Sequence, residues 1–253
     1  MDYVDSYTFL VESFHSDYTG RLTMPLLGDH LLAAAGNHSQ RRGWGRNALD
    51  GTNHTWVLSR LCMEMESFPV QQDQVIVDTW VESVIRMFTN RNFTIRRPDG
   101  TIYGYARSVW ALIDLQTRKP CDLTTLMDGD ILRYVVPEDQ NVCPIEGHGK
   151  FRFKEPKLLR TIDTYFSDMD VNGHVNSMKY IEHILNLFPA SRYAQEHVRR
   201  FEIAYKAESF CGDKLSFYCQ SDDEKVYDVE VRKNEGEVVC QARVFFEAKN
   251  VAR

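Results

Sequence analysis

The sequence repeats one pattern in its two halves, and this repeat constrains the fold more than any other feature. Residues 97–107 match residues 233–243, with a glycine at the fourth position and an Ala-Arg pair at the last two positions of each copy. Each copy places a turn signal between two runs of strand-forming residues, which predicts a β-hairpin. A repeat of this kind predicts two copies of one structural unit.

Further strand-forming runs precede the hairpin in each half. They cover residues 55–68 and 74–84 in the first half and residues 198–210 and 214–221 in the second. A turn separates the two runs of each pair, at Pro69 in the first case and at Gly212-Asp213 in the second. Each half is therefore expected to contain a run of about four antiparallel strands.

One long helical stretch lies upstream of these strands in each half. The first covers residues 24–43, with Pro25 in its first turn, and the second covers residues 174–188 and is ended by Pro189. In the second stretch, apolar residues recur at three- and four-residue steps and form one stripe: Val175, Met178, Ile181 and Leu185. Such a stripe packs on one face of a sheet. We therefore expect an α+β fold, the tandem (double) hotdog, in which an antiparallel β-sheet wraps a long helix in each half.

The repeat also predicts the domain organisation. The two domains are expected at residues 1–136 and 157–253. Between them, residues 137–156 contain proline, glycine and polar residues without a period, which is typical of a linker. The alternative is a pair of unrelated α+β domains.

Composition excludes several classes of function. The net charge of −6 disfavours a nucleic-acid-binding protein, which needs a basic face. No apolar run approaches the length that spans a bilayer, and the N-terminal residues lack the features of a secretory signal. The six cysteines show neither a CxxC pair nor a zinc-binding spacing. We therefore expect reduced thiols, a cytoplasmic location and no membrane span.

The most specific polar segment comes directly before the second helical stretch. Asp170, Asn172 and His174 alternate at a spacing of two, which points their side chains to one side of an extended or turn-like segment. A helix start adds unpaired N–H groups and partial positive charge, which suit a developing oxyanion. Two other interpretations are a helix cap at Asp170 or Asn172 and a purely structural histidine. The spacing of His174 and His183 disfavours a metal site.

Three segments resemble one enzyme family. The run DMDVNGHVNSMKYIEHIL at residues 168–185 is similar to the helix-start motif of acyl-ACP thioesterases, which release fatty acids from acyl carrier protein (ACP). Residues 53–83 resemble the family's Trp-Val-Leu-Ser/Thr-Arg strand and its Asp-x-Val-x-Val-x-Thr-Trp strand. Residues 105–120 resemble its Ala-x-Ser-x-Trp segment. The resemblance extends from about Tyr7 to the C-terminus and implies hydrolysis of a fatty acyl-ACP thioester.

The resemblance also assigns catalytic residues. The family's catalytic Asp, Asn and His fall on Asp170, Asn172 and His174, and its catalytic Glu falls on Glu208. The family's cysteine is replaced by Ser209.

A second departure from the family is Ser177, which stands where a second asparagine is usual. Cys211 follows Ser209 by two residues, but the turn at Gly212 begins there, so we do not expect it to replace the missing cysteine.

The serine favours an activated water over a covalent intermediate, because a hydroxyl is a poor nucleophile without a dedicated base. Glu208 is then expected to act as general base, with His174 sharing the water or relaying its proton. Asn172 and the N–H groups of the helix start would stabilise the oxyanion, and Asp170 would orient Asn172 or His174. Ser209 would have at most a secondary role. This mechanism requires no metal and no organic cofactor.

The implied partner is ACP carrying a fatty acyl chain. Since ACP is acidic, a local basic patch is expected beside the site. The candidates lie in two clusters: Arg41, Arg42 and Arg46, and Arg199 and Arg200. The first half would bind the acyl chain without taking part in catalysis, because the small residues 33–36 leave space beside the sheet. The chain could be a monomer or form a homodimer.

Two other functions share parts of this evidence. An acyl-CoA thioesterase of another hotdog branch would use the same chemistry on a different carrier. A non-catalytic acyl-binding hotdog module would keep the fold without the reaction, and the complete set of four polar residues argues against it.

Overall fold

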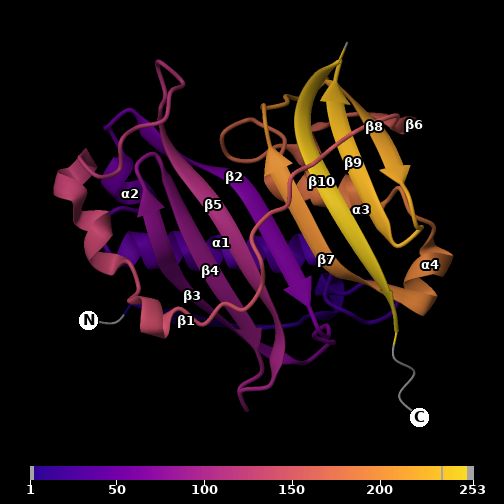
Figure 1. The fold of residues 1–253 in the computed structure, drawn as a ribbon, viewed down its shortest axis with the longest axis horizontal. Coiled ribbons are helices and arrows are strands. Elements are labelled where there is room, and N and C mark those ends of the chain that lie inside the picture. The colour runs from indigo at the N-terminus through magenta and orange to yellow at the C-terminus, as the bar shows by residue number, and fades with distance from the viewer. Residues whose placement is uncertain (1–2, 235, 250–253) are drawn as a thin grey trace. The chain divides into compact units, whose positions relative to one another are not determined.

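The computed structural model describes residues 3–234 and 236–249, which form two compact units (Figure 1). Unit 1 comprises residues 1–147 and unit 2 residues 148–253. The boundary between the units falls inside the segment expected to be a linker. Glu235 of the predicted second hairpin, and the outermost residues of the two predicted domains, lie outside the described residues.

Unit 1 consists of a strand, a helix and then four further strands. Its strands pair antiparallel in the order β1-β3-β4-β5-β2. The elements are β1 (Asp5–Leu10), the 3-10 helix η1 (Ser13–His15), α1 (Met24–Arg41), α2 (Arg46–Leu49), β2 (His54–Met65), β3 (Gln74–Ile85), β4 (Phe88–Arg96), β5 (Ile102–Asp114), η2 (Leu126–Tyr134) and η3 (Glu138–Gln140).

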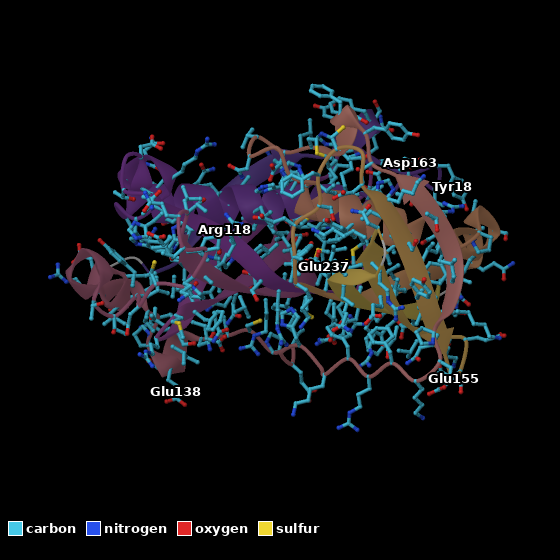
Figure 2. The ribbon with its side chains drawn as sticks, turned by 90° about the horizontal axis from the view of Figure 1, so that it is seen from above. Tyr18, Arg118, Glu138, Glu155, Asp163 and Glu237 are labelled. Carbon is cyan, nitrogen blue, oxygen red and sulfur yellow. The ribbon has the colours of Figure 1, made fainter. Side chains whose placement is uncertain are left out.

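Unit 2 repeats this order. Its strands pair antiparallel in the order β7-β10-β9-β8-β6. The elements are β6 (Lys157–Asp163), η4 (Phe166–Asp168), α3 (Ser177–Leu185), α4 (Ala190–Gln195), β7 (Glu196–Tyr205), β8 (Lys214–Ser221), β9 (Val226–Lys233) and β10 (Glu237–Ala248). Figure 2 labels Asp163, which ends β6, and Glu237, which begins β10. The predicted α+β class and the predicted repeat of one unit are therefore found.

The two helices differ in how closely they follow their predicted limits. α1 ends two residues before the predicted Gly43. α3 is shorter than the predicted 174–188, because Asn176 caps its N-terminus and the chain turns after Leu185. Its buried residues are Met178, Tyr180, Ile181 and Ile184, so the apolar stripe is present but is shifted from Leu185 to Ile184.

Each helix covers one face of its own sheet. In unit 1, Leu27, Leu31 and Ala34 of α1 are buried, and the helix lies behind the strands in the view of Figure 1. In unit 2, Ile181 of α3 is buried, as are Phe201 and Phe217 of the sheet. Full burial of one such large apolar side chain contributes about 1.5–3 kcal/mol. This packing fixes the position at which each helix begins.

Two histidines of α1 are packed into unit 1 in their neutral form. The His30 ring stacks on Phe9, with centroids 3.5 Å apart, and burial together with the nearby His15 lowers its pKa to about 4. His38 is fully buried, with its Nε2 3.1 Å from the carbonyl oxygen of Tyr3, and burial together with Arg91 lowers its pKa to about 3. Both histidines are structural.

The lowered pKa of His30 predicts a loss of stability in acid. Unfolded His30 titrates near pH 6.5, so between pH 6.5 and 4 the unfolded chain binds a proton that the folded chain does not, and the free energy of unfolding falls with pH. A His30→Phe variant keeps the stacking on Phe9 but cannot titrate. Relative to wild type, it should gain about 1 kcal/mol between pH 7 and pH 5, allowing for solvent screening. Urea unfolding at the two pH values measures this gain, and parallel pH dependences would contradict it.

Candidate active site

Residues 169–175 of unit 2 fold into a tight turn that closes on itself. Met169 and Val175 form an isolated antiparallel bridge, and the N–H of Asp170 donates to the carbonyl oxygen of His174 at 2.7 Å. Gly173 has a φ of 78°, in the left-handed region that glycine adopts without strain. This segment lies directly before α3 and carries Asp170, Asn172 and His174, the three residues predicted to be catalytic. We call it the catalytic turn.

The Asp170 carboxylate lies inside the catalytic turn and holds it together. Its Oδ1 accepts the N–H of Asn172 at 2.8 Å and the N–H of His174 at 3.2 Å, and its Oδ2 lies 3.4 Å from Nδ2 of Asn172. The N-cap of α3 is instead Asn176, whose side chain accepts the N–H of Met178 at 2.8 Å. Asp170 and Asn172 are therefore not caps of α3, and Asp170 fixes the position of His174.

A second loop brings Glu208 to this turn. β7 ends at Tyr205, and the carbonyl oxygen of Ser209 in the following loop accepts the N–H of Val175 at 2.8 Å. This bond places Oε1 of Glu208 3.5 Å from Nδ1 of His174. Both side chains are partly exposed, by 25% for His174 and 35% for Glu208, so solvent reaches the pair. The structure thus brings together two residues that are far apart in the sequence.

Two neighbours of this pair were not predicted from the sequence. Nζ of Lys233, at the end of β9, donates to the carbonyl oxygen of Glu208 at 2.7 Å and so fixes the loop. The ring of Phe210 meets the His174 ring edge-on, with centroids 5.1 Å apart. No local pattern marks either residue, because both act through contacts made across the unit.

Asp168 anchors the beginning of the catalytic turn, and it was also missed. This buried side chain accepts the N–H of Tyr165 at 2.8 Å, and its carbonyl oxygen accepts the N–H of Asn176 at 2.8 Å. Its Oδ1 lies 3.5 Å from Nε2 of His183 on α3. The beginning of the turn is therefore tied to α3 and to its N-cap, whereas Val175 at the end of the turn is tied to the loop of Glu208 through Ser209.

Ser209 is poorly placed to act as a nucleophile. Its side chain is fully buried, and its Oγ makes no hydrogen bond to any residue that the structure describes, including His174. It approaches the Tyr180 hydroxyl without the geometry of a hydrogen bond, and burial raises the pKa of Tyr180. Cys211 is exposed on the same loop. A nucleophilic hydroxyl needs a base within hydrogen-bond reach, and Ser209 has none among the described residues.

The five candidate arginines differ in how accessible their charge is. The Arg42 side chain is buried in unit 1 and holds Asp5 through Nη1 and Nη2, at 2.6 and 3.1 Å. Arg200 of unit 2 is paired with the buried Glu202 at 2.7 Å. Each of these two charges is paired inside its own unit, so Arg42 and Arg200 are less accessible to an acidic partner than an exposed arginine would be, and their role in docking stays a prediction.

The other three arginines are less enclosed. Arg41 is 68% exposed and lies 3.7 Å from Asp5, and Arg46 is exposed. Nε of Arg199 lies 3.7 Å from Glu247. Arg41 and Arg46 therefore keep the most accessible positive charge of the candidate set.

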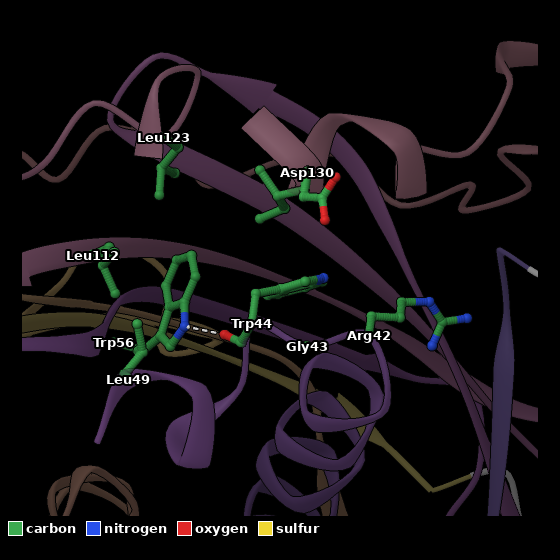
Figure 3. A pocket seen from close by; sticks show the side chains of 9 residues that line it. Arg42, Gly43, Trp44, Leu49, Trp56, Leu112, Leu123 and Asp130 are labelled. Atoms are coloured by element: carbon green, nitrogen blue, oxygen red, sulfur yellow. Dashed lines mark hydrogen bonds between the residues drawn. The ribbon is translucent and has the colours of Figure 1, made fainter. Parts of the chain in front are cut away.

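A small cavity lies in unit 1, beyond the C-terminal end of α1 (Figure 3). Its volume of about 20 Å³ is enough for roughly one water molecule. Apart from Arg42 and Asp130, its lining is mainly apolar, and it includes Trp44 and Trp56, whose indole N–H donates to the carbonyl oxygen of Trp44 at 2.9 Å. Of the small residues 33–36, Ala34 and Ala35 are buried and Ala33 and Gly36 are exposed, and the expected space for an acyl chain beside them stays a prediction.

Two features of the described part of the chain bear on other functions. No cluster of three or more His, Cys, Asp or Glu side chains in residues 3–234 and 236–249 has the geometry of a metal site. No helix in those residues combines the length and the apolar character that a membrane crossing demands.

Comparison with known families then tests the resemblance. The family described as the acyl-ACP thioesterase N-terminal domain matches residues 2–127, and the one described as the acyl-ACP thioesterase C-terminal domain matches residues 154–248. The chain belongs to the acyl-ACP thioesterase family. The matches cover one half-chain each, in agreement with the two units of the structure.

Solved structures confirm the predicted tandem hotdog fold. An acyl-ACP thioesterase from Bacteroides thetaiotaomicron is 48% identical, with a TM-score of 0.91 over 97% of this chain and 98% of that one. The 12:0-ACP thioesterase from Umbellularia californica has the same fold, with a TM-score of 0.83 at 21% identity over 98% and 99% of the two chains.

The curated relatives are longer plant proteins. Oleoyl-acyl carrier protein thioesterase 2 from Arabidopsis thaliana, a chloroplastic protein, is 25% identical over 85% of this chain and 59% of its own length. The chain thus spans about three fifths of this relative, and about half of the palmitoyl-acyl carrier protein thioesterase from the same organism.

The hydrogen bonds of Asp170 make its removal testable. Asp170→Ala deletes the acceptor of two N–H groups and should lower the free energy of unfolding by about 1–3 kcal/mol. Asp170→Asn keeps a carbonyl acceptor and should lose less stability. Urea unfolding of the two variants measures the difference. If alanine and asparagine were equally stable, the proposed hold of this side chain on the turn would be wrong.

Proposed function

We propose that the protein hydrolyses the thioester of a fatty acyl-ACP and releases free fatty acid and ACP. The observation that carries the proposal is the approach of Glu208 to His174, at 3.5 Å, in a chain of this family. Relatives named for oleoyl-, palmitoyl- and dodecanoyl-ACP hydrolysis support the substrate class.

In the proposed reaction, a water molecule attacks the thioester carbonyl. Glu208 accepts a proton from this water, with His174 sharing the water or relaying the proton, since their separation of 3.5 Å lets one water contact both groups. The tetrahedral intermediate collapses, the carbon–sulfur bond breaks, and the pantetheine thiolate leaves. Because such a thiol has a pKa near ~8.5, its departure needs no strong general acid.

The oxyanion would be stabilised mainly by the catalytic turn. The side-chain amide of Asn172 is exposed and oriented by Asp170. The N–H of Met178, in the first turn of α3, is already taken by Asn176, so the helix start offers fewer donors than the sequence suggested. Asn172 is therefore expected to supply the largest part of this stabilisation.

The remaining assignments are part of the same proposal. Unit 1 would hold the acyl chain, as expected from its small residues 33–36. A cytoplasmic location is supported by the free cysteines, which form no disulfide among the described residues.

Substitution of the paired residues tests the mechanism. His174→Ala and Glu208→Gln should each lower the rate of acyl-ACP hydrolysis by at least about a hundredfold, because each removes a group that handles the proton of water. Ser209→Ala should cause only a small loss, since its hydroxyl forms no hydrogen bond with either residue. Free-thiol release from dodecanoyl-ACP is the measurement.

Three outcomes would contradict this proposal. Abolition of hydrolysis by Ser209→Ala, with an acyl-enzyme trapped in His174→Ala, would establish a covalent route. Faster hydrolysis of dodecanoyl-CoA than of dodecanoyl-ACP would favour the acyl-CoA thioesterase. No thiol release from either carrier would favour an acyl-binding module.

The exposed arginines give a test of the carrier. Arg46→Glu should raise the KM for acyl-ACP severalfold and leave hydrolysis of a small uncharged thioester unchanged, because it repels only the acidic carrier. Arg160→Glu, an equal charge change on exposed β6, is the matched control. Added salt should raise the wild-type KM in the same way. An equal effect of both variants would argue against docking at Arg46.

A further inference from the structure

Unit 1 contains a second turn built like the catalytic turn. Residues 16–22 close through an isolated antiparallel bridge between Ser16 and Leu22, and the N–H of Asp17 donates to the carbonyl oxygen of Arg21 at 2.9 Å. Gly20 has a φ of 77°, against 78° for Gly173 of the catalytic turn. The sequence did not reveal this match, because only the aspartate and the glycine are shared.

The Asp17 carboxylate holds this second turn as Asp170 holds the catalytic turn. Its Oδ1 accepts the N–H of Thr19 at 2.7 Å and lies 3.4 Å from the N–H of Arg21. The Thr19 hydroxyl also donates to it at 2.7 Å. The two turns therefore share a backbone whose shape is set by one carboxylate and one glycine.

The surroundings of the two turns correspond as well. A 3-10 helix precedes each turn and a long helix follows it. The N–H of Leu22 donates to the carbonyl oxygen of Pro69 at 2.9 Å, as that of Val175 donates to Ser209 at 2.8 Å. By this correspondence, Arg21 takes the place of His174 and Phe68 takes the place of Glu208.

Arg21 and Phe68 cannot perform the proton transfer proposed for His174 and Glu208, but Arg21 supplies a positive charge. A guanidinium stays protonated and cannot act as a base, and Phe68 has no carboxylate. Arg21 is half-buried, and within residues 3–234 and 236–249 its guanidinium makes neither an ion pair nor a hydrogen bond. The second turn thus presents an unneutralised arginine where the catalytic turn presents its histidine.

Large apolar side chains are exposed on the segments that adjoin this arginine in the chain or in the bridge. Phe14 in η1 is 80% exposed, and Tyr18 in the turn, labelled in Figure 2, is 67% exposed. Val70, which forms an isolated backbone bridge with Arg21, is exposed too. A cation with an apolar rim suits an amphipathic anion, whose charge meets the guanidinium while its chain covers the rim.

We propose that the second turn binds the carboxylate of a long-chain fatty acid, at a site separate from the catalytic turn. The guanidinium fork of Arg21 matches a carboxylate and can hold both oxygens at once. The identity of the ligand rests on the proposed function, because a fatty acid is the product of that reaction. At this site the protein would bind the fatty acid that it releases, and no hydrolysis would take place at the second turn.

Equilibrium dialysis of the full chain with radiolabelled dodecanoate tests this proposal. Wild type should bind two equivalents, one at each turn. The Arg21→Gln variant should bind one equivalent of dodecanoate, because the affinity of the second site falls at least about tenfold when the pair between guanidinium and carboxylate is lost. The Arg21→Lys variant should bind two equivalents, with weaker affinity at the second turn than wild type, because an ammonium point charge replaces the planar guanidinium. Arg160→Gln, which removes an exposed arginine elsewhere, should bind as wild type does.

Further probes decide between this ligand and others. Dodecanol, which has the chain but no carboxylate, should fill only the catalytic site. Filling of both sites by dodecanol, or unchanged binding of dodecanoate by Arg21→Gln, would overturn the proposal. Displacement of the second dodecanoate by millimolar inorganic phosphate at constant ionic strength would also overturn it, since the ligand would then be a phosphate group.

Hydrolysis of dodecanoyl-ACP by the same preparations separates this proposal from the proposed function. If hydrolysis occurs and wild type binds a single equivalent, the second site is refuted and the function stands. If no hydrolysis occurs but Arg21-dependent binding is found, the function is refuted and the second site stands.

Discussion

The candidate site depends on one carboxylate enclosed by its own turn. Asp170 accepts two backbone N–H groups, and hydrogen bonds to a charged group are worth about 1.5–3 kcal/mol each, more than ordinary ones. With the turn closed, the N–H of Val175 faces the carbonyl oxygen of Ser209, and that bond positions the loop of Glu208. His174 and Glu208 therefore lie close together because the backbones of the turn and the loop are joined, and this placement does not depend on an interaction between the two side chains.

This order of dependence explains what the sequence could and could not predict. Hairpins, helices and their repetition follow from local patterns, so the α+β class and the tandem arrangement were predictable. The start of α3 was misplaced, because four polar residues precede it and only the structure shows that Asn176 is the cap. Lys233 acts through a bond to the backbone of Glu208, 25 positions away, for which no spacing rule exists. The Asp168 side chain binds the N–H of Tyr165 only three positions away, in a capping pattern that the sequence analysis did not use. The pairing of Glu208 with His174 came from the family resemblance, since no pattern links two segments so far apart.

The exposure of the charged arginines could not be predicted from the sequence either. Arg41 and Arg42 are adjacent in sequence and were treated alike, yet one is 68% exposed and the other 7%. The difference arises because Arg42 holds Asp5, 37 positions away, inside unit 1. Ser209 is a comparable case within the site. Its replacement of a cysteine suggested a change of chemistry, and in the structure its buried Oγ forms no hydrogen bond with any described residue, so no base is placed to activate it.

The twin turns show that scaffold and reactivity are separable in this fold. In both copies the backbone is fixed by an aspartate and a glycine, while the residue after the glycine, Arg21 or His174, contributes its N–H to the frame and its side chain takes no part in closing the turn. Selection could therefore exchange that side chain in one copy without remodelling the polypeptide around it. Duplication of this unit thus supplies two copies of one backbone frame whose side chains can diverge independently.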